Sequence, residues 1–401
     1  MDEIQMKIIS VVGARPNFMK IAPFIRAIEQ NNSLADAEKI QHILVHTGQH
    51  YDDRMSRSFF KSLNIPDADI NLGVGSGSHA EQVGRTMMAF EKVVQAEKPD
   101  WVVVVGDVNA TCACSITAKK EGVKVAHIEA GLRSRDMNMP EEINRLVTDR
   151  LSDLLLTPDE MSSQNLLNEG TPRERVRFVG NIMIDTLEAN REKALQLNIS
   201  DIIENNFIMG ETKNLIYNKS SLNRPAVLTL HRPSNVDEKE ILEPIVNFLT
   251  REVVRELPLL WIIHPRTKKQ LKTFGLWEKL ASIENLFLLK PLAYHELLRL
   301  NMTASIVLTD SGGLQEECCV LGTPCLTLRW NTERPVTLSK YGGASILVGN
   351  DIERIRQAFR DSFNRKRKPS HPALWDGHTA PRIVHELLKA NQGVMENVNC
   401  L

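Results

Sequence analysis

The fold is decided first by residues 11–20, VVGARPNFMK, where a short apolar run leads through a glycine-containing turn into a helix-forming segment. Residues 308–317, LTDSGGLQEE, repeat this strand–turn–helix pattern much later in the chain. Free backbone amides at a helix N-terminus favour phosphate, and both segments place polar donors beside those amides. The two segments therefore predict a phosphate-binding corner in each half of the protein and a ligand that carries phosphate.

The composition excludes several classes of protein. With 401 residues the chain is long for a single core, so two domains are expected. Its 49 basic and 50 acidic residues nearly cancel, so we expect neither nucleic acid nor a membrane as a partner. No apolar run reaches the roughly 18 residues of a membrane helix. The acidic start is unlike a signal peptide, and a cytoplasmic location is expected.

The six cysteines indicate neither zinc nor disulfides. None belongs to a C-x-x-C pair, and several lie within apolar helix or strand patterns, which favours buried, reduced thiols. We expect no metal site. No G-x-G-x-x-G follows a predicted strand, and G-x-x-x-x-G-K-[ST] is absent, so dinucleotide and P-loop sites lose their main support.

Apolar runs alternate with amphipathic segments of helix length, which is typical of parallel α/β sheets. Continuous runs such as WVVVV at 101–105 suit strands that are buried on both faces. The join between the domains is expected between residues 180 and 224, where the asparagine-rich piece 205–224 predicts a loop or a frayed helix end. The basic run at 365–369 predicts a solvated loop. Strands are expected at 7–12, 43–45, 101–105, 123–128, 153–157 and 175–179, and then at 225–230, 259–263, 285–289, 304–309, 324–328 and 345–348.

Ligands of open parallel sheets bind beyond the carboxyl ends of the strands. The polar residues directly after the predicted strands are therefore the candidates for a functional site. The gathering of so many ionisable residues at one edge favours function, although any one of them can be structural. The candidates include Arg15, Asp107, Glu129, His231, His264, Asp310 and Ser311.

The acidic candidates have structural explanations as well as functional ones. Asp107 precedes a predicted helix, so it can be an N-cap, a catalytic group or both. Glu129 can form a buried ion pair with Arg133. At the following helix start, Glu142 is expected to compensate the helix dipole, whereas the preceding turn is expected to return Glu141 toward Glu129.

Two further candidates lie in the second half of the chain. His231 closes a strand, where it can transfer a proton, pair with a diphosphate or be a satisfied core residue. Glu317 lies on the helix opened by residues 311–313, and a carboxylate there can accept both hydroxyls of a ribose. Its neighbour Glu316 is expected to face solvent or to pack against other side chains.

The ordered set of motifs resembles the UDP-N-acetylglucosamine 2-epimerases of the non-hydrolysing type. Each motif is weak alone, but their joint order is specific and covers most of the chain. The matches are GARP at 13–16 with Lys20, GD at 106–107, HIEAGLR at 127–133, PEEINR at 140–145, HR at 231–232, HP at 264–265, DSGGLQEE at 310–317 and TERP at 332–335.

The resemblance implies an α/β fold of two Rossmann-like domains with parallel sheets, the glycosyltransferase-B architecture, facing across an interdomain cleft. Residues 1–183 would form the N-terminal domain, completed by a C-terminal helix at 377–395. Residues 184–376 would form the UDP-binding C-terminal domain. Such enzymes are commonly homodimers.

The resemblance also implies reversible epimerisation at C2 of UDP-GlcNAc to UDP-ManNAc, without a metal or a nicotinamide cofactor. UDP is eliminated, a 2-acetamidoglucal forms, and UDP is added back. Matched position by position, the acid/base candidates are Asp107, Glu129 and Glu141, and His231 would assist the departing diphosphate. The positions matched to substrate binding are Arg15, Lys20, His264, Ser311, Gly312, Gly313, Glu317 and Arg334.

Two features of the sequence leave the identity of the substrate's sugar undecided. Many relatives read His-Arg-x-Glu-Asn where this chain has HRPSN at 231–235, and the opening GARPNF resembles relatives that act on 2,3-diacetamido uronic acid nucleotides. UDP-GlcNAc is the expected substrate, with a product that supplies surface polysaccharide, and the diacetamido sugar nucleotide is the alternative. A hydrolysing epimerase releasing ManNAc and UDP, a glycosyltransferase of the same architecture and a non-catalytic sugar-nucleotide sensor are the remaining hypotheses.

Overall fold

The computed structural model describes residues 4–13, 15–48, 65–208, 224–280 and 282–398, with the side chains of residues 4–5, 15–16 and 393–398 left out. The chain divides into two compact units. Unit 1 comprises Met1–Glu188 and Pro372–Leu401, and unit 2 comprises Ala189–His371. The chain passes from the first unit to the second inside one helix, α7 (Ile182–Leu195).

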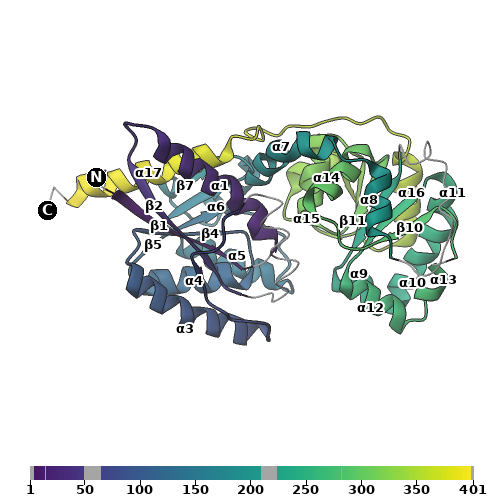
Figure 1. The fold of residues 1–401 in the computed structure, drawn as a ribbon, viewed down its shortest axis with the longest axis horizontal. Helices are drawn as coiled ribbons and strands as arrows, with labels where there is room; N and C mark the ends of the chain where they lie inside the picture. Colours follow the sequence, from purple (N-terminus) through teal and green to yellow (C-terminus); the bar gives the residue numbers. More distant parts are fainter. Residues whose placement is uncertain (1–3, 14, 49–64, 209–223, 281, 399–401) are drawn as a thin grey trace. The chain divides into compact units, whose positions relative to one another are not determined.

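Unit 1 is built on a parallel sheet whose described strands follow the order β3-β2-β1-β4-β5-β6-β7 (Figure 1). The strands are β1 (Ile4–Val12), β2 (Lys39–His46), β3 (Ile70–Asn71), β4 (Trp101–Val105), β5 (Lys124–Ile128), β6 (Leu154–Thr157) and β7 (Val176–Phe178). Besides the start of α7, its helices are α1 (Arg15–Ser33), α3 (His79–Glu97), α4 (Asn109–Lys120), α5 (Pro140–Leu151), α6 (Glu160–Asn168) and α17 (Thr379–Val398).

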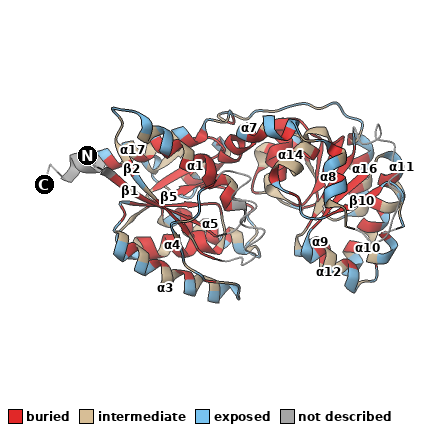
Figure 2. Cartoon of the chain, in the orientation of Figure 1, coloured by how far each residue is buried: buried red, intermediate tan, exposed pale blue. Residues whose placement is uncertain are grey.

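The apolar runs of unit 1 form strands because both faces of its sheet are covered. All five residues of β4 are buried, and Val102 and Val104 join a cluster with Phe90 and Val94 of α3. Buried strands are red in Figure 2, whereas the outward face of α3 is exposed. The C-terminal helix α17 packs against α1 of the same unit.

Unit 2 repeats the arrangement with a parallel sheet in the order β10-β9-β8-β11-β12-β13. The strands are β8 (Ala226–Leu230), β9 (Leu259–Ile263), β10 (Leu286–Leu289), β11 (Ile306–Thr309), β12 (Cys325–Thr327) and β13 (Ser345–Leu347). After the end of α7, the helices are α8 (Ile199–Asn206), α9 (Pro233–Val236), α10 (Lys239–Phe248), α11 (Val254–Glu256), α12 (Pro265–Thr273), α13 (Trp277–Leu280), α14 (Tyr294–Thr303), α15 (Gly312–Leu321) and α16 (Ile352–Ser362), with a π-helical turn at Leu249–Val253.

Alternate residues of β8 and β9 enter two different cores. Leu228 and Trp261 belong to one buried cluster, and Val227 and Leu260 belong to a second. Successive side chains of a strand point to opposite faces, so this division shows that apolar residues cover both faces of the sheet. The continuous apolar runs therefore indicate buried parallel strands, as the sequence predicts.

The predicted fold class, α/β with two parallel sheets, is confirmed, and each of the twelve predicted strands is present. The largest difference in a strand start is at β2, which begins at Lys39 instead of residue 43. The sequence missed β3, because a two-residue strand is too short to show a periodic pattern. Most of the predicted loop at 205–224 lies outside the described residues.

The solvated loop predicted at 365–369 is wrong for Arg367. Its guanidinium donates to the carbonyls of Asn301 and Ala304, each at 2.7 Å, and to the hydroxyl of Thr323 at 2.8 Å. Burial lowers the pKa of Arg367 below its ordinary value. This side chain ties the loop to the α14–β11 and α15–β12 connections, which a run of charges in the sequence does not reveal.

Five of the cysteines lie in the described residues, and each is a buried free thiol: Cys112, Cys114, Cys318, Cys319 and Cys325. Cys400 lies outside the described residues. Within the described part of the chain, no helix has both the length and the apolar character needed to cross a bilayer. In the same part, no group of three or more His, Cys, Asp or Glu side chains is placed to hold a metal ion.

Candidate active site

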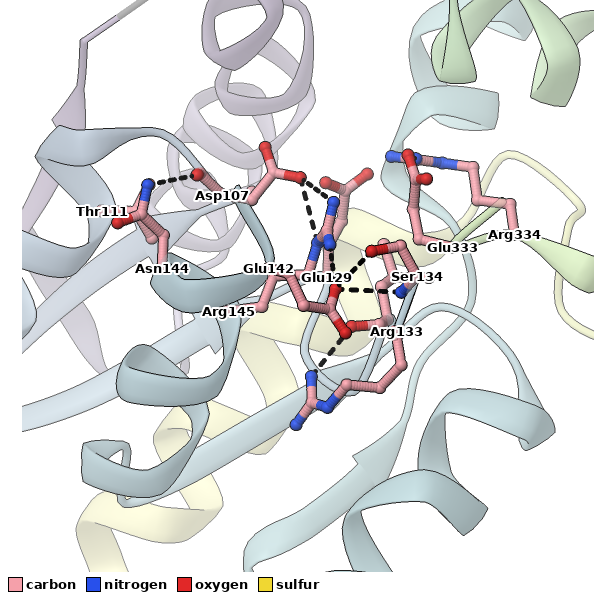
Figure 3. Close-up of polar contacts among 12 residues, drawn as sticks. Asp107, Thr111, Glu129, Arg133, Ser134, Glu142, Asn144, Arg145, Glu333 and Arg334 are labelled. Atoms are coloured by element: carbon pink, nitrogen blue, oxygen red, sulfur yellow. Dashed lines mark hydrogen bonds and ion pairs between the residues drawn. The ribbon is translucent and has the colours of Figure 1, made fainter. Parts of the chain in front are cut away.

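Asp107 lies in the turn that follows β4, and its carboxylate is held by Arg145 of α5. Its Oδ2 accepts from Nε of Arg145 at 3.1 Å and from Nη2 at 2.7 Å. The N-cap of α4 is Val108, so the interpretation of Asp107 as the cap of this helix is wrong. Figure 3 shows Arg145 between the carboxylates of Asp107 and Glu142. The guanidinium fixes the direction in which Asp107 presents its remaining oxygen.

Glu142 anchors the turn that precedes α5. Its Oε2 accepts from the amide and the hydroxyl of Ser134, both at 2.9 Å, and its Oε1 accepts from the amide of Arg135 at 2.8 Å. The same carboxylate pairs with Arg145 and is buried. Its role therefore goes beyond the predicted compensation of the helix dipole. The neighbouring Glu141 is half-buried and takes no part in these contacts.

Glu129 follows β5 and is buried in an ion pair with Lys20 of α1. Its backbone φ is 74°, a left-handed conformation that residues other than glycine adopt at a cost. Its Oε1 is buried and has no hydrogen-bond partner among the described residues. A buried carboxylate with one neutralising cation and one unsatisfied oxygen is suited to accept a proton or a donor from a ligand.

The predicted pair between Glu129 and Arg133 is wrong. Arg133 instead donates from Nη1 to Asp149 at 2.6 Å and forms two bonds to Glu169, at 2.8 Å from Nε and 2.7 Å from Nη2. Burial opposes the charge of Arg133, but Glu169 and Asp149 outweigh it and raise the pKa of its guanidinium. A turn at residues 129–131 separates Glu129 from Arg133, and the two side chains have different partners.

Gly106 lets these groups approach one another. Its φ is 71°, and a Cβ atom at this position would lie 3.3 Å from Nζ of Lys20 and 3.5 Å from Oε2 of Glu129. β4 and β5 are adjacent parallel strands, so the turns that follow them carry Asp107 and Glu129 at the same edge of the sheet. Unit 1 thus places two ion pairs at this edge, Asp107 with Arg145 and Glu129 with Lys20.

His231 follows β8 in unit 2 and is paired with Asp310, which follows the adjacent strand β11. Nδ1 of His231 lies 2.7 Å from Oδ1 of Asp310. The Asp310 carboxylate also accepts from the amides of His231 and Arg232 and from the side chain of Asn235. Burial would raise the pKa of Asp310, but His231 and the two amides outweigh it and lower the pKa to about 2.

His231 is 40% exposed at its side chain, whereas Asp310 is buried. Because Nδ1 faces the carboxylate, Nε2 is the nitrogen left to meet a ligand. His264, at the N-cap of α12, has its ring centroid 5.5 Å from that of His231, and its Nδ1 accepts from the amide of Arg266 at 3.2 Å. The two predicted histidines therefore lie together at the edge of this sheet.

The strand–turn–helix corner that was predicted to bind phosphate is formed by β11, Ser311 and the start of α15. Ser311 is the N-cap, its side chain makes no capping bond, and Gly312 and Gly313 open the helix in a half-buried position. A Cβ at Gly312 would lie 2.7 Å from Nη1 of Arg334. Glycine is required here because the buried guanidinium approaches the backbone so closely. The amides and the dipole of α15 favour an anion at this corner.

Arg334, a predicted substrate-binding residue, is buried within a row of charges. Its Nε lies 2.7 Å from Glu316, its Nη1 pairs with Glu333, and Glu333 pairs in turn with Arg329 at 2.6 Å. Glu316 is thus buried against Arg334 instead of facing solvent. Arg15, another predicted substrate-binding residue, begins α1 on the equivalent corner of unit 1, and its side chain lies outside the described residues.

Glu317 is buried on α15, five residues after Gly312. Burial raises the pKa of Glu317 to about 7, although hydrogen bonds from Tyr294 and Asn301 oppose the increase. Burial therefore favours the protonated form of this carboxyl group compared with an exposed glutamate.

The family model for UDP-N-acetylglucosamine 2-epimerase matches residues 32–388 of this chain. The chain belongs to this family. A curated relative from Methanocaldococcus jannaschii, named UDP-N-acetylglucosamine 2-epimerase, is 42% identical over 383 residues, which cover 95% of this chain and 99% of that protein. The UDP-2,3-diacetamido-2,3-dideoxy-D-glucuronate 2-epimerase of Pseudomonas aeruginosa is 36% identical over 386 residues, with coverage of 96% and 100%.

A solved structure of the M. jannaschii UDP-GlcNAc 2-epimerase, in complex with UDP-GlcNAc and UDP, is also similar. It superimposes with a TM-score of 0.84 at 41% identity, covering 96% of this chain and all of that one. The similarity to the UDP-N-acetylglucosamine 2-epimerase family thus extends over both units.

In this epimerase-family chain, Arg145 was not singled out from the sequence, and Asp310 was a candidate whose partner was not predicted. Arg145 lies three residues after Glu142, and positions i and i+3 share one helix face, so the PEEINR motif contained that signal. Asp310 follows a predicted strand, as do the other candidates, but only its distance to His231 shows its importance. No sequence pattern indicates a partner 79 residues away.

Proposed function

We propose that this protein is an isomerase that epimerises UDP-GlcNAc at C2 and gives UDP-ManNAc. The observation that carries the proposal is the pair of carboxylates at adjacent strand ends of unit 1, each held by its own cation. Asp107 pairs with Arg145, and Glu129 pairs with Lys20. Removing a proton from one face of a sugar ring and returning it to the other needs two such groups.

In the first step, a carboxylate of unit 1 takes the C2 proton while the bond between C1 and the UDP oxygen breaks. The electron pair of the broken C–H bond forms the C1–C2 double bond of a 2-acetamidoglucal, and UDP carries away the negative charge. In the second step, the UDP oxygen attacks C1 and a proton is delivered to C2 from the opposite face. Asp107, Glu129 and Glu141 are the candidates for these transfers.

The departing diphosphate needs electrostatic help, because the C2 proton is only weakly acidic. The start of α15, with Ser311, Gly312 and Gly313, supplies backbone amides for the phosphates. His231, oriented by Asp310, presents Nε2 as a donor to a phosphate oxygen. We propose that Glu317 accepts the ribose hydroxyls, and that Arg15, Lys20, His264 and Arg334 complete the contacts with the substrate.

Solvent isotope incorporation tests this proposal. In deuterated water, the protein is expected to convert UDP-GlcNAc into UDP-ManNAc with one deuterium at C2, measured by proton NMR and mass spectrometry. Glu129→Gln is expected to abolish incorporation while UDP still binds, because the phosphate corner belongs to unit 2. UDP-GlcNAc recovered without deuterium after incubation with folded protein would exclude this substrate, and free ManNAc as the main product would indicate a hydrolysing enzyme.

UDP-2,3-diacetamido-2,3-dideoxyglucuronic acid is the second candidate substrate. The similarity to the P. aeruginosa epimerase over 96% of the chain favours it. In addition, Ser234 stands exposed where many relatives carry glutamate, so this turn presents a neutral side chain to an acidic sugar. Competition between the two nucleotides in the isotope experiment decides the substrate: the one with the higher kcat/KM is the better candidate.

A further inference from the structure

His127 lies within β5, and its buried ring bridges α5 and the turn after β4. Its Nδ1 lies 2.6 Å from Oδ1 of Asp149 on α5, and its Nε2 lies 2.8 Å from the carbonyl oxygen of Gly106. That carbonyl belongs to the peptide bond that leads into Asp107. One buried ring therefore connects α5 to the turn that carries a proposed acid/base carboxylate.

The partners of this ring define its protonation. A backbone carbonyl can only accept, so Nε2 carries a proton. Asp149 accepts from the amide of Gly131 at 3.0 Å and from Arg133 at 2.6 Å through its other oxygen. Burial would raise the pKa of Asp149, but His127 and Arg133 lower it below its ordinary value. An ionised carboxylate can only accept, so the 2.6 Å contact requires a proton on Nδ1 as well, and the inferred form of the ring is a cation.

Asp149 also fixes the chain on both sides of Glu129. It holds His127, two residues earlier, by the ring and Gly131, two residues later, by the amide. Between these anchors, Glu129 has a φ of 74°. A left-handed conformation at such a residue costs roughly 1–3 kcal/mol and persists only where the surroundings over-determine it. The two bonds to Asp149 supply this constraint.

We infer that His127 and Asp149 are positioning residues, which set the relative placement of Asp107 and Glu129 through a cationic imidazole and a carboxylate. The effect of this positioning on catalysis rests on the proposed function. Both side chains are buried, so they are assigned no contact with substrate. His127 holds the Gly106–Asp107 peptide, and Asp149 holds the turn of Glu129, so the two proton-transfer groups are fixed to one another before substrate arrives.

His127→Phe tests the bridge, because phenylalanine retains a ring and loses both bonds. A misplacement of about 1 Å can cost on the order of 100-fold in rate, and we expect a loss of kcat of this order with KM nearly unchanged. Asp149→Asn is the milder variant. Its amide can donate to Nδ1, so the ring becomes neutral while Nε2 still donates to Gly106. Asp149→Asn is therefore expected to retain at least half of the activity that His127→Phe loses.

His42→Phe is the matched control, because His42 is a histidine on another strand of the same sheet. His42 lies on β2, bonds to the hydroxyl of Ser10 at 2.7 Å, and touches neither turn. This variant is expected to keep kcat within about twofold of the wild type. UDP affinity and Tm, measured for all variants, show which ones are folded. A folded His127→Phe variant with wild-type kcat would overturn the inference.

The ring charge is measured without substrate. In protein labelled with ¹⁵N-histidine at pH 7.5, both ring nitrogens of His127 are expected to show protonated shifts, assigned by their loss in His127→Phe. Burial lowers the pKa of His42 to about 4, so its ring is the neutral reference. A neutral His127 ring contradicts the inference whatever the activity. If the wild type shows no turnover, the proposed function is contradicted, and the NMR experiment still tests the charge of the His127 ring.

Discussion

The ring of His231 and the carboxylate of Asp310 form a pair with 2.7 Å between Nδ1 and Oδ1, at the ends of two adjacent parallel strands. The carboxylate is buried and the ring is partly exposed, so the pair has one fixed member and one that faces solvent. In this geometry, Asp310 orients the ring of His231. It also explains why the turn at 231–235 closes on Asp310 through two amides and the side chain of Asn235.

Asp310→Asn is expected to lower kcat at least roughly tenfold, because the amide neither attracts an imidazolium nor fixes the tautomer of the ring. Steady-state kinetics with UDP-GlcNAc measures this effect. His231→Gln supplies the control. If Asp310 acts through His231, the Asp310→Asn change adds little in the His231→Gln background, whereas additive losses would assign Asp310 a separate role.

Lys20→Met is expected to destabilise unit 1 by about 3–5 kcal/mol, because it leaves the carboxylate of Glu129 buried and unpaired. Urea unfolding monitored by circular dichroism measures the change. The double variant Lys20→Met with Glu129→Gln is expected to recover part of this stability, since no uncompensated charge remains. A double variant less stable than Lys20→Met alone would argue against an ionised Glu129.

Gly312→Ala is expected to weaken UDP binding roughly tenfold, equivalent to about 1.4 kcal/mol. The added Cβ would lie 2.7 Å from the Arg334 guanidinium, which two carboxylates hold in place. Isothermal titration with UDP measures the change. Gly84→Ala is the matched control, because a Cβ there meets nothing within 4 Å inside helix α3. The control is expected to keep UDP affinity and to gain up to about 1 kcal/mol of stability.

Glu317→Gln is expected to change how stability depends on pH. Burial raises the pKa of Glu317 from 4.5 to about 7, so the folded state keeps a proton that the unfolded state releases. Between about pH 4.5 and 7 the wild type therefore loses stability as pH rises, relative to the glutamine variant, by a total on the order of 3 kcal/mol. Thermal unfolding at pH 5 and pH 8 measures the difference.

The exposed residue Glu278 on α13 provides the control for that experiment. Glu278→Gln is expected to shift Tm equally at both pH values, since the carboxyl group of Glu278 stays in contact with water in the folded protein. If the Glu317→Gln variant shifted Tm by the same amount at pH 5 and pH 8, the carboxyl group of Glu317 would not have a raised pKa.

The strands and the edge at which the polar residues gather were predictable, because both depend on local patterns. The runs WVVVV and LLWII at β4 and β9 indicate buried parallel strands by themselves. The residues after such strands must then meet at one edge. The partners were not predictable. Arg133 was expected to pair with Glu129, but it binds Asp149 and Glu169, and a turn at residues 129–131 separates it from Glu129.

The sequence by itself determined two parallel α/β sheets, the strand–turn–helix corner at 311–313 and the membership of the family, because apolar runs, turn glycines and the order of the motifs are all read directly along the chain. Only the tertiary structure decided which charges are paired and which are buried. The partners of Asp107, Glu129 and His231 are 38, 109 and 79 residues away, and their contacts depend on how helices pack on the strands. That packing also joins His127, which belongs to the HIEAGLR motif, to Asp149, which belongs to none of the quoted motifs.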